Sequence, residues 1–425
     1  MPAELGTINS RVGQWIKNFA IYAYFFSTLF IVFFSVHAVQ KWPSLWAQGA
    51  ISLACIVPAI AVLFKVGPDL IGSKKWPVEI KFVLIVVVLG LLNICFSENQ
   101  LASFKGMGLF LMSGILVFSI SYFLFNSKQA QNGFFYLCSF CFVVLLVFGS
   151  FEFIQQINVP GKRILLFSSN PIPAGSLLIL LSIGPLVLAA QAENRWEKFF
   201  WASCLLAGIV LIFLIAQRGP ILALIVMIFV GAMICRNGAW VLILVALVLA
   251  GIGYQFRDSA LLLYKEKLLK KETVLVRMEF YYIALDVLKE KPVFGLGFNP
   301  SLLRFIHADY EPKIYPKDGK NSFLAMARGI NVFDNMFLSL VGEMGGLFAL
   351  AYIGFLAYVL KNIGLVRSEN ANVRVHASLL LIVIAGFLLH SLTFDSLKYP
   401  HLNWIFHSLL GLMAHSQVFG QTKND

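Results

Sequence analysis

The sequence contains few charged residues. Only 13% of its 425 residues are charged, whereas 59% are hydrophobic. A soluble globule of this length needs far more polar surface to cover its core. The composition therefore excludes a soluble protein and indicates a chain that crosses a membrane many times.

The sequence also lacks the patterns that mark disulfides and metal sites. Its six cysteines all lie in or at the ends of apolar runs, and none lies in the longest polar segment. Cys138 and Cys141 have the spacing of a redox pair, but inside an apolar run they are interpreted as small buried hydrophobes. No set of His, Cys, Asp and Glu has metal-ligand spacing, so we expect chemistry without a metal ion or other cofactor.

The N-terminus lacks the features of a secretory signal. Its first 18 residues have no apolar core and no small-residue cleavage site, so we expect no cleaved signal peptide. The formal net charge of +12 is attributed to loops that contact anionic membrane lipid. We expect no nucleic-acid partner.

Apolar runs long enough to cross a bilayer recur along the chain. They lie near residues 19–39, 45–64, 80–97, 106–125, 133–154, 171–190, 199–216, 219–235, 239–254, 336–360, 376–394 and 401–416. The predicted fold is an all-α membrane protein with about twelve transmembrane helices. The runs define a nine-span region at 1–254, a large loop at 255–335 and a three-span region at 336–425, within one integral-membrane domain.

The basic residues of the short loops predict the orientation. Lys and Arg are more frequent in the loops on the side of the N-terminus, as at Lys74, Lys75, Arg195 and Lys198. The positive-inside rule makes this side cytoplasmic, and an even number of spans places both termini there. The large loop then faces outward, where we expect the active site.

The large loop has a helical part and a Gly-rich turn. Apolar residues recur at three- and four-residue spacing over 257–291, with lysines on the opposite side, which predicts a pair of amphipathic helices. Residues 291–298 follow as a turn that contains Gly295 and Gly297. No strand precedes this turn, so it is not a dinucleotide-binding site.

Two arginines are candidates for binding an anion. Arg218 lies in a polar island between two short apolar runs, with Gly219 and Pro220 breaking the helix. A guanidinium inside a membrane costs about 2.5–3.5 kcal/mol on insertion scales, so it must face protein, water or an anion such as a lipid phosphate. The alternative is a loop arginine that extends to the membrane surface. Arg277 lies among apolar and aromatic neighbours.

Polar residues at the end of the loop are candidates for catalysis and binding. Asp334 precedes the next apolar run, so we expect it to cap that helix, with Asn335 beside it. The same carboxylate is a candidate general base. Arg304 is a further candidate in the irregular part of the loop. The tyrosines are candidate sugar-stacking surfaces, namely Tyr281, Tyr282, Tyr310 and Tyr315.

The order of three motifs resembles a known family. Gln217-Arg218-Gly219, the Arg277 helix with its Gly-rich turn, and Asp334-Asn335 running to Gly346 resemble the O-antigen ligase and polymerase superfamily. Its members are integral-membrane glycosyltransferases of the GT-C type. The resemblance covers about residues 205–350. It implies a bacterial inner-membrane protein whose large periplasmic loop covers a cavity between spans.

The resemblance also implies roles for single residues. Arg218 and Arg277 would hold the diphosphate of an undecaprenyl-linked glycan, and Asp334 would activate the acceptor hydroxyl. Arg304 and Asn335 would bind substrate. The reaction would be metal-independent and inverting.

The residues do not identify the acceptor of the reaction. Ligases of this family carry His where this chain has Asp334, which favours a repeat-unit polymerase over a ligase acting on lipid A-core. The partners are then the lipid-linked donor, a glycan or lipid-linked acceptor and membrane lipid, with a chain-length regulator as a candidate and a monomer assumed. A peptidoglycan polymerase and a flippase or other transporter are alternatives. His390, Asp395 and Lys398 form a second polar cluster, to which we assign no catalytic role.

Overall fold

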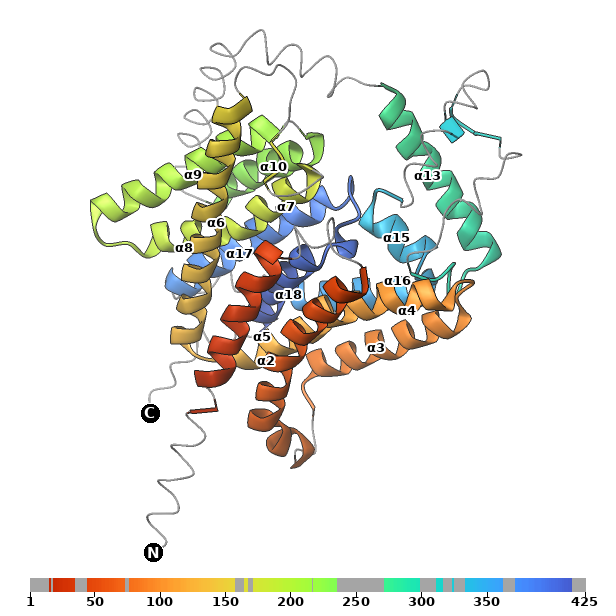
Figure 1. The fold of residues 1–425 in the computed structure, drawn as a ribbon, viewed down its shortest axis with the longest axis horizontal. Helices are drawn as coiled ribbons and strands as arrows, with labels where there is room; N and C mark the ends of the chain where they lie inside the picture. The colour runs from red at the N-terminus through yellow and green to blue at the C-terminus, as the bar shows by residue number, and fades with distance from the viewer. Residues whose placement is uncertain are drawn as a thin grey trace, which may run out of the picture.

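The computed structural model describes most of the chain. The described residues are 15–16, 18–34, 44–72, 76–156, 164–166, 171–215, 217–234, 271–298, 311–315, 323–324, 333–361 and 371–414. All regular elements in these ranges are helices (Figure 1). The predicted all-α class is confirmed for this part of the chain.

The helices follow one another with short connections in most of the chain. In the N-terminal region they are α2 (Ser44–Gly72), α3 (Val78–Phe96), α4 (Gln100–Phe110), η1 (Leu111–Leu116), α5 (Val117–Leu124), α6 (Lys128–Gln156), α7 (Pro171–Leu181), α8 (Ile183–Gln191), α9 (Arg195–Ile215) and α10 (Arg218–Ile234). The remaining ones are α13 (Lys271–Glu290), α15 (Met336–Gly342), α16 (Gly345–Leu360), α17 (Ala371–His390), η6 (Ser396–Lys398) and α18 (Pro400–Ala414). Residues 18–34 are helical as well.

Within the described residues, six stretches of helix are long and apolar enough to cross a membrane. They are Val78–Phe96, Gln100–Leu124, Lys128–Gln156, Pro171–Gln191, Arg195–Ile215 and Val373–His390. Four shorter apolar helices occur at Asn18–Phe34, Gly49–Leu63, Arg218–Met233 and Gly345–Leu360. The count of twelve spans stays a prediction, and the expected span at 239–254 lies outside the described residues.

Proline and asparagine mark several helix starts. Pro77 is the N-cap of α3, and α7 and α18 begin at Pro171 and Pro400. Proline suits these positions because its missing N–H would have no partner in the first turn. At α4, Asn99 caps the helix by accepting the Ala102 N–H at 3.1 Å.

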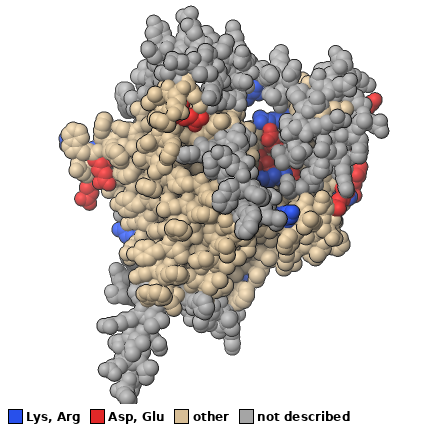
Figure 2. Space-filling model, in the orientation of Figure 1, with Lys and Arg blue, Asp and Glu red and all other residues tan. Residues whose placement is uncertain are grey.

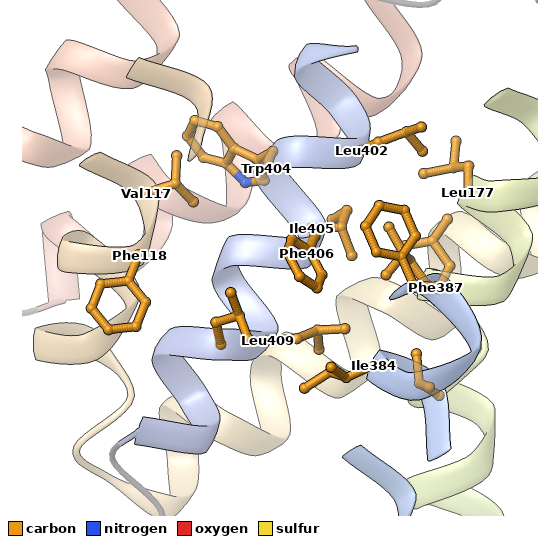
Figure 3. Packing of buried hydrophobic residues seen from close by; sticks show 14 of the residues in the cluster. Val117, Phe118, Leu177, Ile384, Phe387, Leu402, Trp404, Ile405, Phe406 and Leu409 are labelled. Atoms are coloured by element: carbon orange, nitrogen blue, oxygen red, sulfur yellow. The ribbon is translucent and has the colours of Figure 1, made fainter. Parts of the chain in front are cut away.

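Helix α18 is the central element of the bundle. Every residue from Pro400 to Ala414 is buried. Figure 3 shows its apolar side chains between Val117 and Phe118 on one side and Leu177, Ile384 and Phe387 on the other. A helix buried on all sides must satisfy its polar groups internally. Accordingly, the indole N–H of Trp404 donates to Thr28 Oγ1 at 2.9 Å.

A histidine of α18 occupies the space beside a π-helical turn. The His407 ring lies beside Gly114 of η1, where an added Cβ would be 2.9 Å from the imidazole. Its Nε2 lies 3.1 Å from the Tyr352 hydroxyl, and its Nδ1 lies 2.9 Å from the Asn403 carbonyl oxygen. The wider turn of η1 and the missing side chain of Gly114 together make room for this ring.

The apolar run at 336–360 is two helices and not one span. Helix α15 ends at Gly342, and α16 begins at Gly345, whose φ of +84° is in the left-handed region. Backbone of this kind favours glycine because a Cβ would be strained there. The chain therefore bends between α15 and α16. The residues from Gly342 to Gly345 are called the hinge below, and elements of the candidate site bind to it.

The glycine contacts predict where the bundle tolerates an added methyl group. A Cβ at Gly184 would lie 2.5 Å from the Ser139 backbone nitrogen and 2.6 Å from the Phe135 carbonyl oxygen. Because backbone cannot move aside as a side chain can, Gly184→Ala should separate α8 from α6 and lower the free energy of unfolding by about 1–3 kcal/mol. The measurement is thermal unfolding of the purified protein in detergent.

Gly231→Ala is the matched control. Its Cβ would lie 3.6 Å from Ile382 Cδ1, an ordinary contact, and alanine is the better helix former. It should unfold at or above the wild-type temperature. Equal unfolding temperatures for the two variants would contradict the close packing of α6 and α8.

Candidate functional site

The site is centred on an ion pair between helix α13 and the residue that precedes the cap of α15. Arg277 Nη2 and Nε both donate to Asp334 Oδ2, at 3.0 and 3.2 Å. Both side chains are partly exposed, Arg277 by 31% and Asp334 by 18%. The two residues are 57 positions apart in sequence, so tertiary structure alone brings these candidates together. Their charge-assisted hydrogen bonds fix both head groups beside solvent.

Asp334 does not cap α15, so the expected cap is wrong. The N-cap is Asn335, whose Oδ1 accepts the backbone N–H groups of Phe337 and Leu338 at 2.9 and 3.2 Å. Asp334 has a φ of +52°, a left-handed conformation that is uncommon for a residue with a side chain. This turn of the backbone directs its carboxylate to Arg277 and away from the helix end.

Asn335 forms hydrogen bonds that connect α15 with α13 and with the segment that follows α17. Its Nδ2 donates to the Tyr281 hydroxyl at 2.9 Å and to the Leu392 carbonyl oxygen at 2.7 Å. The next backbone N–H, that of Met336, donates to the Ser391 carbonyl oxygen at 2.9 Å. Asn335 is 3% exposed, so these bonds are shielded from water. It is therefore a residue that positions Asp334, and its predicted contact with substrate stays a prediction.

Arg218 lies at the start of α10, close to the end of α17. The helix break precedes Arg218, and Pro220 lies in the first turn of α10, where proline is tolerated. Gly219 faces the ring of His390, where an added Cβ would be 3.1 Å away. The positive charge of Arg277 also acts on the Arg218 guanidinium. Of the two predicted arginines, Arg277 is paired with Asp334, and Arg218 is linked to that pair by this electrostatic interaction.

The Gly-rich turn is joined to the hinge by backbone hydrogen bonds. Its backbone N–H groups at Leu296 and Gly297 donate to Gly342 and Glu343 carbonyl oxygens, at 3.1 and 2.8 Å. In return, the Gly346 N–H donates to the Pro292 carbonyl oxygen at 2.9 Å. Gly295 and Gly297 have φ values of +63° and +98°. The turn therefore holds α13 against the hinge between α15 and α16.

A buried asparagine in α3 fixes the same joint from the membrane side. Asn93 is fully buried, and its Nδ2 donates to the Phe294 carbonyl oxygen at 2.7 Å, with Glu343 and Met344 carbonyl oxygens each at 3.2 Å. The hydroxyl of Ser103 donates to Asn93 Oδ1 at 3.3 Å and accepts the Phe298 N–H at 2.8 Å. The sequence signal for this role was a lone polar residue in an apolar run, and we missed it.

A buried ionic cluster lies behind the catalytic candidates. Lys398 Nζ lies 2.7 Å from Glu343 Oε1 and 3.4 Å from Asp395 Oδ2, and the Ser339 hydroxyl donates to that same oxygen at 2.6 Å. Burial alone would lower the pKa of Lys398, but the two carboxylates outweigh it and raise the pKa. Burial raises the pKa of Asp395, which Lys398 and Ser339 oppose and Asp334 reinforces. The cluster predicted at 390–398 is thus electrostatically linked to Asp334.

Glu279 is another carboxylate that sequence reasoning overlooked. It is fully buried and accepts the backbone N–H groups of Lys313, Ile314 and Tyr315, at 2.6, 2.8 and 3.2 Å. These bonds hold residues 311–315 against α13. Because Glu279 is two residues from Arg277, the same helix carries a scaffold carboxylate on its buried side and a guanidinium at its edge.

The remaining predicted site residue is not placed. Arg304 lies outside the described residues, as does Tyr310. Among the residues that the structure describes, no group of three or more His, Cys, Asp or Glu could hold a metal ion. Figure 2 shows Lys or Arg and Asp or Glu side chains side by side within a recess of this face, amid a surface that is mostly uncharged.

Comparison with known proteins identifies a family for part of the chain. Residues 202–354 match the model of a family described as O-antigen ligase. The match spans Arg218, Arg277, Asp334 and Asn335, and it ends before the ionic partners at Asp395 and Lys398. It confirms the resemblance drawn from the motifs. No curated protein matches the chain.

Mutations in the buried cluster should lower stability by different amounts, depending on how many charges they leave unpaired. Lys398→Met leaves the fully buried Glu343 carboxylate without its cation, and removing one partner of a buried pair costs about 3–5 kcal/mol. The free energy of unfolding in detergent should fall accordingly. The double variant Lys398→Met with Glu343→Gln should lose less, because the Glu343 charge is removed together with the lysine and only Asp395 then lacks its cation.

Lys289→Met is the control for charge removal. Lys289 pairs with Asp286 on the same helix, but its side chain is 77% exposed. An exposed pair contributes about 0–1 kcal/mol. If Lys398→Met is no less stable than Lys289→Met, the buried pair does not stabilise this region.

Proposed function

We propose, from the premise that residues 202–354 belong to the O-antigen ligase and polymerase superfamily, that this protein is a glycosyltransferase acting on a lipid-linked glycan. Its donor is an undecaprenyl-diphosphate-linked oligosaccharide or polysaccharide, and its acceptor is a sugar hydroxyl. Within this class we propose a repeat-unit polymerase. The observation that carries the proposal is the Arg277–Asp334 ion pair beside Arg218.

The proposed reaction needs the two groups that this site brings together. The leaving diphosphate must have its negative charge stabilised, and the attacking hydroxyl must lose a proton. Arg218 and Arg277 are cations that supply the first without requiring a metal ion. Asp334 is a carboxylate within reach of the same space and supplies the second.

The ion pair suggests an order for these events. While Arg277 donates two hydrogen bonds to Asp334 Oδ2, the lone pairs of that oxygen are occupied and do not receive the acceptor hydroxyl. A diphosphate carries more negative charge than a carboxylate and attracts the guanidinium more strongly. Donor binding therefore draws Arg277 away and frees Asp334 only when a leaving group is in place.

In the proposed step, one bond to the anomeric carbon forms while another breaks. The acceptor oxygen attacks the anomeric carbon from the side opposite the diphosphate, while its proton passes to Asp334. The bond between the anomeric carbon and the diphosphate oxygen breaks, and the undecaprenyl diphosphate leaves with the electron pair. This displacement inverts the configuration at the anomeric carbon.

The choice of polymerase rests on the residue at position 334. Ligases of the superfamily carry His there, and this chain has Asp. A ligase that transfers the finished glycan to lipid A-core is the second candidate, since it would use the same donor and the same arginines. The two differ in the acceptor alone, so glycan products distinguish them.

Replacement of Asp334 tests the reaction. In a reconstituted assay that contains EDTA, since the proposal is metal-independent, Asp334→Asn should lower kcat by roughly 10²–10⁴-fold. Arg218→Ala should reduce kcat/KM for the donor because a diphosphate holder is lost. The control is Asp286→Asn, which removes an exposed carboxylate of α13 and should leave the rate unchanged.

The products of cells carrying these variants separate the two candidates. Loss of long lipid-linked polymer, with single repeat units still reaching their final acceptor, supports the polymerase. Polymer that is made but stays on the undecaprenyl carrier identifies a ligase. Glycans that do not change in either variant would contradict glycosyl transfer and favour a transporter.

The orientation is a further part of the proposal. We place the protein in the bacterial inner membrane with both termini in the cytoplasm and α13 in the periplasm, because basic residues are enriched in the loops on the N-terminal side. A cysteine placed at the exposed residue Glu290 should react with a membrane-impermeant maleimide added to intact cells, and one placed at Glu193 should not. The reverse pattern would overturn this topology.

A further inference from the structure

Tyr281 is on the same side of α13 as Arg277. It follows Arg277 by four residues, and residues at this spacing lie one above the other on a helix. Helix α13 packs on the protein through Val276, Phe280, Ile283 and Val287, which are buried. Tyr281 lies outside that buried side and is 45% exposed. Its ring therefore borders the space in front of the Arg277–Asp334 pair.

The Tyr281 ring is held at both ends. Its Cβ belongs to the helix, and its hydroxyl oxygen accepts a hydrogen bond from Asn335 Nδ2 at 2.9 Å. Asn335 is itself fixed by the α15 cap and by its bond to Leu392. A ring fixed in this way loses little conformational entropy when a ligand stacks on it. The hydroxyl hydrogen is not used in the bond from Asn335, so it can donate to a ligand.

The surface beside Tyr281 is apolar. Val274, Met278 and Leu285 follow α13 at helical spacing and are each between 43% and 52% exposed. Leu392, next to the Asn335 contact, is 43% exposed. An exposed aromatic ring beside a carboxylate, bordered by apolar side chains, suits a sugar, whose C–H groups stack on the ring while its hydroxyls form hydrogen bonds.

The neighbouring tyrosine has a different environment. Tyr282 is 38% exposed, and Lys313 Nζ lies 5.5 Å from its ring centroid. Lys313 also binds Asp286 at 2.5 Å. Tyr282 thus already stacks with a cation, and the Asn335 amide binds Tyr281 instead. It offers a matched control on the same helix.

We propose that Tyr281 is the stacking platform for the acceptor sugar, and that it sets the position of the hydroxyl from which Asp334 takes a proton. The proposal rests on the proposed function, because it assigns the acceptor subsite of the same reaction. The ligand class is a pyranose at the end of a glycan. The donor diphosphate binds to the guanidinium groups of Arg218 and Arg277 and not to the Tyr281 ring, so changes at Tyr281 act on the acceptor.

Steady-state kinetics with a short lipid-linked acceptor and a fixed donor test this assignment. Tyr281→Ala should raise KM for the acceptor roughly 3–10-fold, the range of an aromatic contact of about 0.5–1.5 kcal/mol, with KM for the donor unchanged. Tyr281→Phe keeps the ring and should change the acceptor KM less than threefold. Tyr282→Ala should behave as the wild type.

A binding measurement tests the acceptor site at Tyr281 without relying on catalytic turnover. In the Asp334→Asn background, saturation-transfer NMR with the free acceptor oligosaccharide should detect its ring protons, and adding Tyr281→Ala should abolish the signal. Tyr281→Leu fills the space without a ring and gives the same result if Tyr281→Ala fails to fold.

Three outcomes would overturn the assignment. They are an unchanged acceptor KM in Tyr281→Ala, a rise in donor KM of the same size, or a Tyr281→Phe variant as impaired as Tyr281→Ala. If the wild type transfers no glycan at all but still binds the oligosaccharide through Tyr281, the sugar site stands and the proposed reaction fails.

Discussion

The site depends on a set of backbone hydrogen bonds between the Gly-rich turn and the hinge after α15. Leu296 and Gly297 donate to the hinge, and Gly346 donates back to Pro292. Asn93 closes the same joint from within the membrane bundle. Arg277 lies on the helix before the turn and Asp334 just before the helix that ends at the hinge, so these bonds fix the relation between them. A change in the joint would move the guanidinium and the carboxylate relative to each other.

Electrostatics explain why so many charges gather in a largely apolar protein. Arg277 with Asp334 and Lys398 with Glu343 form ion pairs, and Asp395 is held by Lys398 and Ser339. A charge in low-dielectric surroundings is costly unless it is paired. The inner cluster is almost inaccessible to solvent and acts as scaffold, whereas the outer pair is partly exposed and can exchange partners. Burial thus separates groups of similar chemistry into an enclosed cluster and a pair that solvent and ligands can reach.

Much of the site was predictable from local sequence. The apolar spacing over 257–291 predicted a pair of amphipathic helices. Helix α13 confirms helix at 271–290, residues 257–270 lie outside the described residues, and the turn with Gly295 and Gly297 follows α13 as expected. The motif order also singled out Arg277 and Asp334, which form an ion pair, and Arg218, on which the charge of Arg277 acts. These features depend on helical periodicity and on residue types that few conformations accept.

Other features were not predictable because they depend on distant contacts. Asp and Asn are about equally good caps, so local sequence did not reveal that Asn335 caps α15 while Asp334 turns to Arg277. The run at 336–360 gave no sign of its hinge, because the backbone of Val293 and Phe294, which leaves no room for a Cβ at Gly345, reaches it only in the folded chain. The role of Lys398 likewise depends on Glu343, 55 residues away.

The two arginines belong to different environments, and this has a consequence for substrate choice. Arg218 begins an apolar helix of the bundle, whereas Arg277 lies on a helix outside it. In the proposed reaction, a diphosphate that engages both must sit at the depth where bilayer and water meet. A polyprenyl chain holds its head group at that depth, and a water-soluble sugar nucleotide has no such anchor. The two arginines would thus select activated sugars that are attached to a membrane lipid and would exclude soluble ones.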